Sequence, residues 1–175
     1  MDFSAIKYKD EKDRALGLSG MAIALYACDG EHFLASVSVD SPAGEGLELT
    51  PDFALAANQN NSAKAVWNQL LRQYELSSAM LLGNVMCRSY VGMRRPVDHG
   101  ADRLLRTLVN DHGKESCQLD ADETRHIYEK TFAFLDRIFV HSLVAETARQ
   151  LSDKLCAQRQ LSGTEIFDIL SPLGR

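Results

Sequence analysis

One short segment of the sequence brings together residue types that commonly bind metal ions: Asp98, His99 and Asp102. If the segment is helical, Asp98 and Asp102 share one face at i, i+4 spacing, whereas His99 points elsewhere. A carboxylate just before a helix is also a usual N-cap. We therefore interpret Asp98 as a helix cap rather than as a metal ligand. None of the five histidines forms an H-E-x-x-H motif; they are His32, His99, His112, His126 and His141.

Nucleophilic side chains form no recognisable catalytic motif either. The sequence contains no G-x-S-x-G elbow and no G-x-x-x-x-G-K-[ST] phosphate-binding loop. Four cysteines are far apart and form no C-x-x-C pair, so no structural zinc site is indicated; they are Cys28, Cys87, Cys117 and Cys156. Cys87 falls within an expected helix, and we interpret it as a packed thiol rather than a nucleophile.

The composition is that of an ordinary globular domain. The chain has 175 residues, of which 45% are apolar and 25% charged, and a net charge of −5. We expect one domain over residues 1–175, with no nucleic-acid partner because the net charge is negative. No apolar run approaches the roughly 18 residues of a membrane span. The opening residues form no apolar signal region, so we expect a cytoplasmic protein with free thiols.

Hydrophobic periodicity predicts a mainly helical fold. The expected helices are about six, over residues 10–27, a short one after Thr50-Pro51, then 62–90, 98–112, 120–159 and from Ser162 onward. Gly113 is the expected stop of the fourth helix, and Ser162 with Glu165 forms a capping box for the last. Gly83, inside the third, indicates close helix packing.

Between the first two helices the sequence changes to β-type alternation. Residues 32–40 alternate apolar and polar side chains, and 47–49 follow a turn that contains Gly44 and Gly46. Together they predict a small two-stranded β-ribbon. The expected fold class is therefore mainly α, a helical bundle with one β-ribbon.

Several segments, in this order, resemble the peptidase domain of FtsH-type ATP-dependent zinc proteases. The segment 32–37 resembles the strand that follows the family's metal helix. Ala79 to Gly83 resembles its A-x-L-L-G segment, and 110–113 its aromatic-Gly helix end, with His112 in place of the aromatic residue. Leu161 to Ile166 resembles the L-x-G-x-E-[IV] signature of its last helix. The resemblance covers nearly the whole chain and implies an FtsH-peptidase-like fold.

The resemblance breaks at the residues that perform the family's chemistry. The family's first helix carries H-E-x-x-H, whose histidines hold zinc and whose glutamate handles the proton of the attacking water. Here Gly17, Leu18 and Met21 stand at those three positions. The family's third ligand, an aspartate, falls on Val97; Asp98 is its remnant only after a one-residue slip.

A relative without these groups is expected to be inactive. Bound metal lowers the pKa of water from about 15.7 to about 7, and glycine and leucine side chains cannot bind zinc. The leading hypothesis is therefore a catalytically inactive peptidase-like domain, without cofactor or ATPase module, that acts by protein binding or assembly. Two alternatives stay open: an active hydrolase or metalloprotease with an unrecognised site, and an unrelated helical interaction module.

Binding at a strand edge would survive the loss of catalysis. The short strand Leu47, Glu48 and Leu49 is the expected edge of the ribbon, where backbone groups can pair with an extended peptide. Its brevity and the charge of Glu48 are equally typical of protection against aggregation. Because the family assembles into rings, the resemblance implies a second copy of the chain or a related protease as the protein partner.

Overall fold

The computed structural model describes residues 6–42, 45–54 and 62–174. Within these ranges it contains seven α-helices and one three-stranded antiparallel sheet. The helices are α1 (Glu11–Ala27), α2 (Pro51–Ala54), α3 (Ala63–Cys87), α4 (His99–Cys117), α5 (Ala121–Phe139), α6 (Ser142–Gln158) and α7 (Gly163–Leu170). The mainly helical class expected from the sequence is confirmed.

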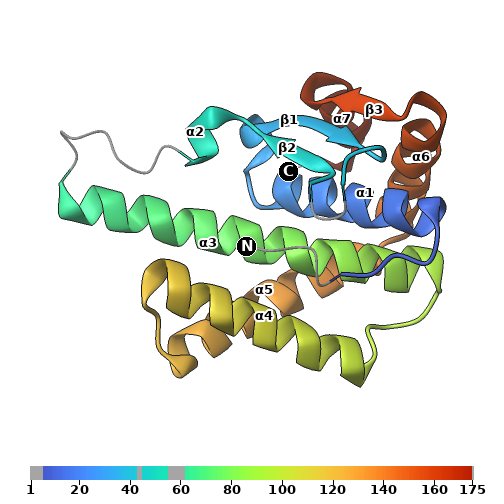
Figure 1. The fold of residues 1–175 in the computed structure, drawn as a ribbon. Coiled ribbons are helices and arrows are strands. Elements are labelled where there is room, and N and C mark those ends of the chain that lie inside the picture. Colours follow the sequence, from blue (N-terminus) through green and yellow to red (C-terminus); the bar gives the residue numbers. More distant parts are fainter. Residues whose placement is uncertain (1–5, 43–44, 55–61, 175) are drawn as a thin grey trace.

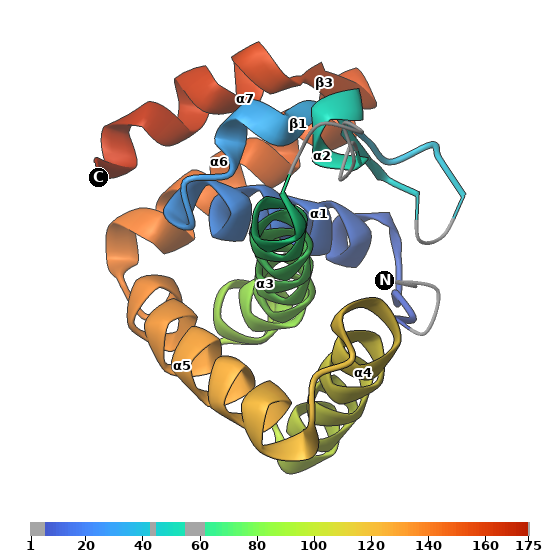
Figure 2. The same ribbon diagram turned by 90° about the vertical axis from the view of Figure 1, so that its left-hand side faces the viewer.

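Helix α3 lies at the centre of the molecule. Seen along its axis in Figure 2, α3 has α1 and α6 on one side and α4 and α5 on the other. The sheet and α7 cover the side of α1 that faces away from α3 (Figure 1). Helix α1 is therefore enclosed, and all twelve residues from Ala15 to Tyr26 are buried.

A very close approach in the core joins α1 and α3 at two glycines. A Cβ atom on Gly20 would lie 2.1 Å from the carbonyl oxygen of Gly83, and one on Gly83 would lie 2.4 Å from that of Gly20. Such distances are not tolerated, so the two backbones can approach this closely only because both residues lack a side chain. This confirms the interpretation of Gly83 as a packing residue.

The sheet has one more strand than the predicted ribbon. Its order is β2 (Leu47–Leu49), β1 (Leu34–Ser38) and β3 (Gln160–Ser162), with both pairings antiparallel. The expected strand over 32–40 is shorter because Glu31–Phe33 forms a 3₁₀ turn. β3 pairs with β1 from the far end of the chain, a contact that local sequence does not encode. Strand β2 is an edge strand, as predicted.

Two helix boundaries differ from the sequence-based expectation. Gly113 does not end α4, which continues to Cys117; Gly113 instead lies inside the helix, where a Cβ would meet Thr124 at 2.6 Å. The expected helix over 120–159 is two helices, because the chain turns at Val140 and His141 between α5 and α6. Close packing against Thr124, rather than helix termination, explains Gly113.

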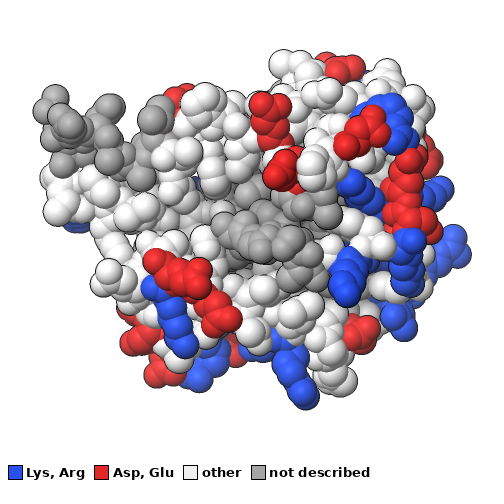
Figure 3. Space-filling model, viewed as in Figure 1, with Lys and Arg blue, Asp and Glu red and all other residues white. Residues whose placement is uncertain are grey.

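Helix α3 ends differently from the prediction as well. The α-helical part ends at Cys87, and a π-helical turn follows over Arg88–Gly92. In this turn the Met93 amide donates to the carbonyl oxygen of Arg88 at 2.9 Å. π-helical turns are rare and often occur at functional sites. This turn lies at the right-hand end of the molecule in Figure 1, where basic and acidic side chains gather on the surface (Figure 3).

The predicted helix starts are confirmed. Asp10 caps α1 by accepting from the Asp13 amide at 2.8 Å, and Asp120 with Glu123 forms a capping box on α5. Ser162 and Glu165 form the predicted capping box on α7. The polar segment 58–61 and Gly44 lie outside the described residues. Among the residues described, no helix combines the length and the hydropathy of a membrane span.

Candidate functional site

Gly17 faces a polar group in the core rather than open space. A Cβ atom on Gly17 would lie 2.8 Å from Nδ2 of Asn84 and 2.9 Å from Cε1 of Tyr8. The Asn84 amide donates to the Tyr8 hydroxyl at 2.9 Å, and Asn84 is fully buried. No histidine side chain fits at this position unless these neighbours move.

Leu18 and Met21 are part of the hydrophobic core. They are 3% and 4% exposed. Leu18 packs beneath the hairpin of β1 and β2, because a Cβ on Gly46 would lie 2.8 Å from its Cδ2 atom. An apolar side chain therefore fills the position at which the resemblance would place the glutamate of the peptidase motif.

The three motif positions do not fit a zinc ion. Gly17 and Leu18 offer no ligand atom, and the buried thioether of Met21 is a poor match for zinc. Within residues 6–42, 45–54 and 62–174, no three His, Cys, Asp or Glu side chains are grouped so that they could hold a metal ion. We therefore derive no metal-dependent step for this chain.

Asp98 is the N-cap of α4. Its Oδ1 accepts from the Ala101 amide at 2.9 Å, and Oδ2 lies 3.6 Å from Nη2 of Arg95. The hydrogen bond from the Ala101 amide holds the pKa of Asp98 below its usual value. The interpretation of Asp98 as a cap is confirmed.

The other predicted candidates also have structural partners. Asp102 accepts from the Tyr128 hydroxyl at 2.7 Å and from Nε of Arg106 at 3.0 Å, so its carboxylate links α4 to α5. Cys87 is fully buried, and burial raises the pKa of its thiol to about 12. A thiol with this pKa is not a nucleophile at neutral pH.

The open side of β2 presents unpaired backbone groups. Gly46 accepts from the Ser38 amide at 2.8 Å, Glu48 is the partner of Ser36, and the Thr50 amide donates to Phe33 at 2.7 Å. The N–H and C=O groups of successive residues point to alternate sides of a strand. Those of Leu47 and Leu49 therefore point away from β1. No strand of the described sheet pairs with that side.

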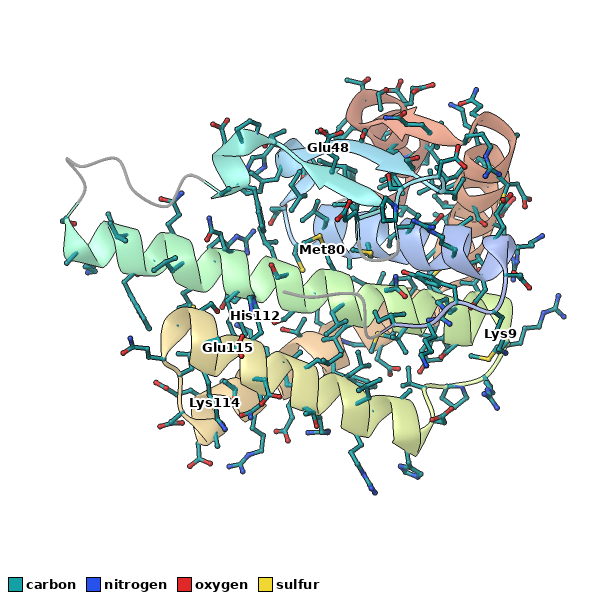
Figure 4. All side chains as sticks on the ribbon, viewed as in Figure 1. Lys9, Glu48, Met80, His112, Lys114 and Glu115 are labelled. Atoms are coloured by element: carbon teal, nitrogen blue, oxygen red, sulfur yellow. The ribbon has the colours of Figure 1, made fainter. Side chains whose placement is uncertain are left out.

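The side chains of β2 divide between the two faces of the sheet. Leu47 and Leu49 are half-buried and pack against the core, whereas Glu48 is exposed on the opposite face (Figure 4). Glu48 accepts from the Ser36 hydroxyl at 2.8 Å. A shallow polar cleft of about 420 Å³ lies beside it, lined by Ser36, Ser38, Ser41, Glu45, Gly46, Leu47, Glu48 and Gln160.

Two further hollows were not foreseen from the sequence. An apolar groove of about 510 Å³ lies between α1, α5, α6 and the end of the chain, lined mainly by aliphatic and aromatic side chains that include Phe134 and Leu143. A charged cleft of about 370 Å³ lies where the π-helical turn meets α1 and α6. The only local sign of the charged cleft in the sequence is the pair of nearby arginines, Arg88 and Arg94.

The chain was compared with protein-family models, curated proteins and solved structures, and none of the three comparisons found a match.

Proposed function

We propose that this protein is a catalytically inactive relative of the FtsH-type peptidase domain, and that it binds an extended segment of another polypeptide along the open edge of β2. One observation supports the proposal above all. The helix positions of the missing metal motif are buried core directly beneath the hairpin whose outer strand has a free edge. Binding at an edge uses backbone groups and needs no catalytic side chain.

The free edge of β2 determines the conformation and the length of the segment that can bind. The unpaired backbone groups of Leu47 and Leu49 can form hydrogen bonds to one extended strand of two or three residues. Each such bond contributes only about 0.5–1.5 kcal/mol, so side-chain contacts must supply the rest. The polar cleft beside Glu48 and Glu45 favours a segment with a lysine or arginine opposite Glu48, since opposite charges on neighbouring strands attract.

The experiment compares two variants of one residue. Leu49→Pro and Leu49→Ala both remove the half-buried leucine side chain, but only proline also removes the outward-pointing N–H. Partners captured by the wild-type protein are quantified with each variant, and circular dichroism checks that the helices are intact. We expect Leu49→Ala to retain the partner and Leu49→Pro to lose most of it. Equal retention by a folded Leu49→Pro protein would place the binding surface elsewhere.

A second experiment with the same proline variant identifies the source of the bound segment. Light scattering after size-exclusion chromatography measures whether wild-type protein forms a dimer that Leu49→Pro dissociates. A dimer with this behaviour means that β2 pairs with β2 of a second copy, in an isologous arrangement. A monomer that still captures partners means that the segment belongs to a different protein, for which a related protease is the family's precedent.

The inactive state has its own test. Elemental analysis after mild purification should find no stoichiometric zinc, and the protein should not cleave casein with added zinc and ATP. About one zinc per chain, or cleavage that a chelator abolishes, would contradict the proposal and restore the peptidase interpretation.

A further inference from the structure

The charged cleft at the π-helical turn has an excess of positive charge on a molecule that is negative overall. Its lining contains five basic and three acidic side chains, namely Lys9, Lys12, Arg88, Arg94 and Arg149 against Asp10, Asp13 and Asp153. The chain as a whole carries −5. The cleft therefore favours an anion, whereas the net charge of the molecule does not.

Two of the cleft's acids are already paired. Asp13 accepts from both Nε and Nη2 of Arg88, at 2.8 and 2.6 Å, and Asp153 lies 3.5 Å from Nζ of Lys12. Within the described ranges, Arg94 and Arg149 form no ion pair with a carboxylate. In the part of the chain that the structure describes, the ammonium group of Lys9 donates to the sulfur of Met93 at 3.8 Å, and its charge also helps to lower the pKa of Asp13. Arg94 and Arg149 therefore remain for a ligand.

Two rare backbone conformations next to the cleft determine where Arg94 lies. Arg94 has a φ of +53°, a left-handed conformation that is uncommon for residues other than glycine. It lies two residues after the end of the π-helical turn, another rare conformation. Strained backbone conformations persist only where the surrounding structure holds them, and they cluster at active and ligand-binding sites. Here they bring Arg94 to the same cleft as Arg149 of α6.

The wall formed by α6 contains an unused polar group. Ser152 lines the cleft and is fully buried, and its hydroxyl forms no hydrogen bond with any described residue. Buried hydroxyls without a partner are rare, since each costs about 1–3 kcal/mol. The cleft thus combines unpaired cations with a spare hydrogen-bond donor in its wall.

We propose that this cleft binds the phosphate group of a small phosphate monoester. Its excess of two positive charges matches a dianion, and the planar guanidinium groups of Arg94 and Arg149 suit phosphate oxygens. A metal cation is disfavoured by the same charge. This inference is separate from the binding edge of β2, and neither depends on the other.

The test is an NMR titration of ¹⁵N-labelled protein with inorganic phosphate and with glycerol phosphate, at constant ionic strength set with sodium chloride. We expect saturable shifts in the amides of 88–94 and 149–153. Arg149→Gln and Arg94→Gly should each weaken the affinity at least about fivefold, because charged hydrogen bonds are lost. Arg94→Gly folds readily, because glycine adopts a positive φ without strain.

Arg103→Gln is the matched control. Arg103 is an exposed arginine of α4 without a carboxylate partner in the part of the chain that the structure describes, and it does not line the cleft. Its loss should leave the affinity unchanged. Three results would overturn the proposal: no saturation up to about 20 mM phosphate, a concentration at which binding is worth only about 2 kcal/mol; equal weakening by Arg103→Gln; or unchanged affinity in both cleft variants.

Discussion

At the scale of single residues, the core is organised by positions that cannot accept a side chain. Gly20 and Gly83 let α1 and α3 touch through their backbones, and a Cβ on Gly20 would also lie 2.5 Å from that of Cys87. Neither neighbouring backbone can move without shifting a whole helix. The resemblance to a peptidase gave no reason for these glycines, whereas the helix crossing does.

Gly20→Ala should therefore destabilise the protein by about 1–3 kcal/mol or more, the usual cost of overpacking. Urea unfolding followed by circular dichroism measures the change. Gly100→Ala is the control, because Gly100 is exposed in the first turn of α4 and a Cβ there meets only the side chain of Asp98, at 3.3 Å. That variant should gain up to about 1 kcal/mol from better helix propensity. Equal effects would contradict the packing argument.

Introducing the H-E-x-x-H residues of the peptidase that the sequence resembles should destabilise the fold rather than create a zinc site. The triple variant Gly17→His, Leu18→Glu and Met21→His forces a ring against Asn84 and Tyr8 and buries a carboxylate among apolar side chains. We expect loss of cooperative unfolding and no zinc retained after dialysis. A folded triple variant that binds one zinc would contradict this expectation and would support the proposed relationship to the peptidase.

At the scale of whole elements, the junction between α5 and α6 is a helix start without a side-chain cap. His141 is the N-cap of α6 with extended backbone, and its side chain forms no capping hydrogen bond. No acidic residue lies in the first turn of α6. The caps Asp10, Asp120 and Ser162 all form the bond that His141 lacks.

His141→Asp should stabilise the protein by about 0.5–2 kcal/mol, because aspartate accepts from the free amides of the first turn and favours the positive end of the helix dipole. Thermal unfolding at pH 7 measures the gain. His141→Asn separates the two effects, since asparagine caps without a charge. A lower melting temperature for both variants would mean that His141 has a partner role that outweighs capping.

The same elements explain which parts of the fold the sequence predicts. Helix starts were predicted correctly at Asp10, Asp120 and Ser162, because a cap acts within four residues of itself. The break at Val140 and His141 was missed, because neither residue is a strong helix breaker. Strand β3 was missed because its three residues are held in the sheet by β1, far away in sequence. The charged cleft needs residues from three elements and has no local signature.

At the scale of the molecule, acid should weaken the fold through His112. The imidazole is half-buried beneath α3, with its ring centroid 5.6 Å from that of Tyr74, and burial lowers the pKa of His112 from 6.5 to about 4 (Figure 4). The unfolded chain therefore takes up this proton at a higher pH than the folded one. The contribution of His112 to the free energy of unfolding is therefore fully present above pH 6.5 and is lost as the pH falls toward 4.

His112→Phe should remove this loss while keeping a ring against Tyr74. Between pH 6.5 and 4 we expect the free energy of unfolding to fall by about 1–3 kcal/mol less in the variant than in the wild type. Denaturant unfolding at several pH values gives both curves. His126→Phe, at an exposed position of α5, controls for the loss of one histidine. Parallel curves for wild type and His112→Phe would assign the acid sensitivity to other groups.

The enclosure of α1 has a consequence for how the molecule opens. Water can reach the backbone amides of Ala15 to Tyr26 only when both the sheet side and the α3 side separate, so their hydrogen exchange should report the free energy of global unfolding. The amides of Leu47 and Leu49, on the free edge above the same helix, should exchange far sooner through local fluctuations. We therefore expect the slowest and the fastest of these exchange rates in neighbouring elements, since a Cβ atom on Gly46, just before β2, would lie 2.8 Å from Cδ2 of Leu18 in α1. A bound segment would slow exchange at the edge and leave the helix unchanged.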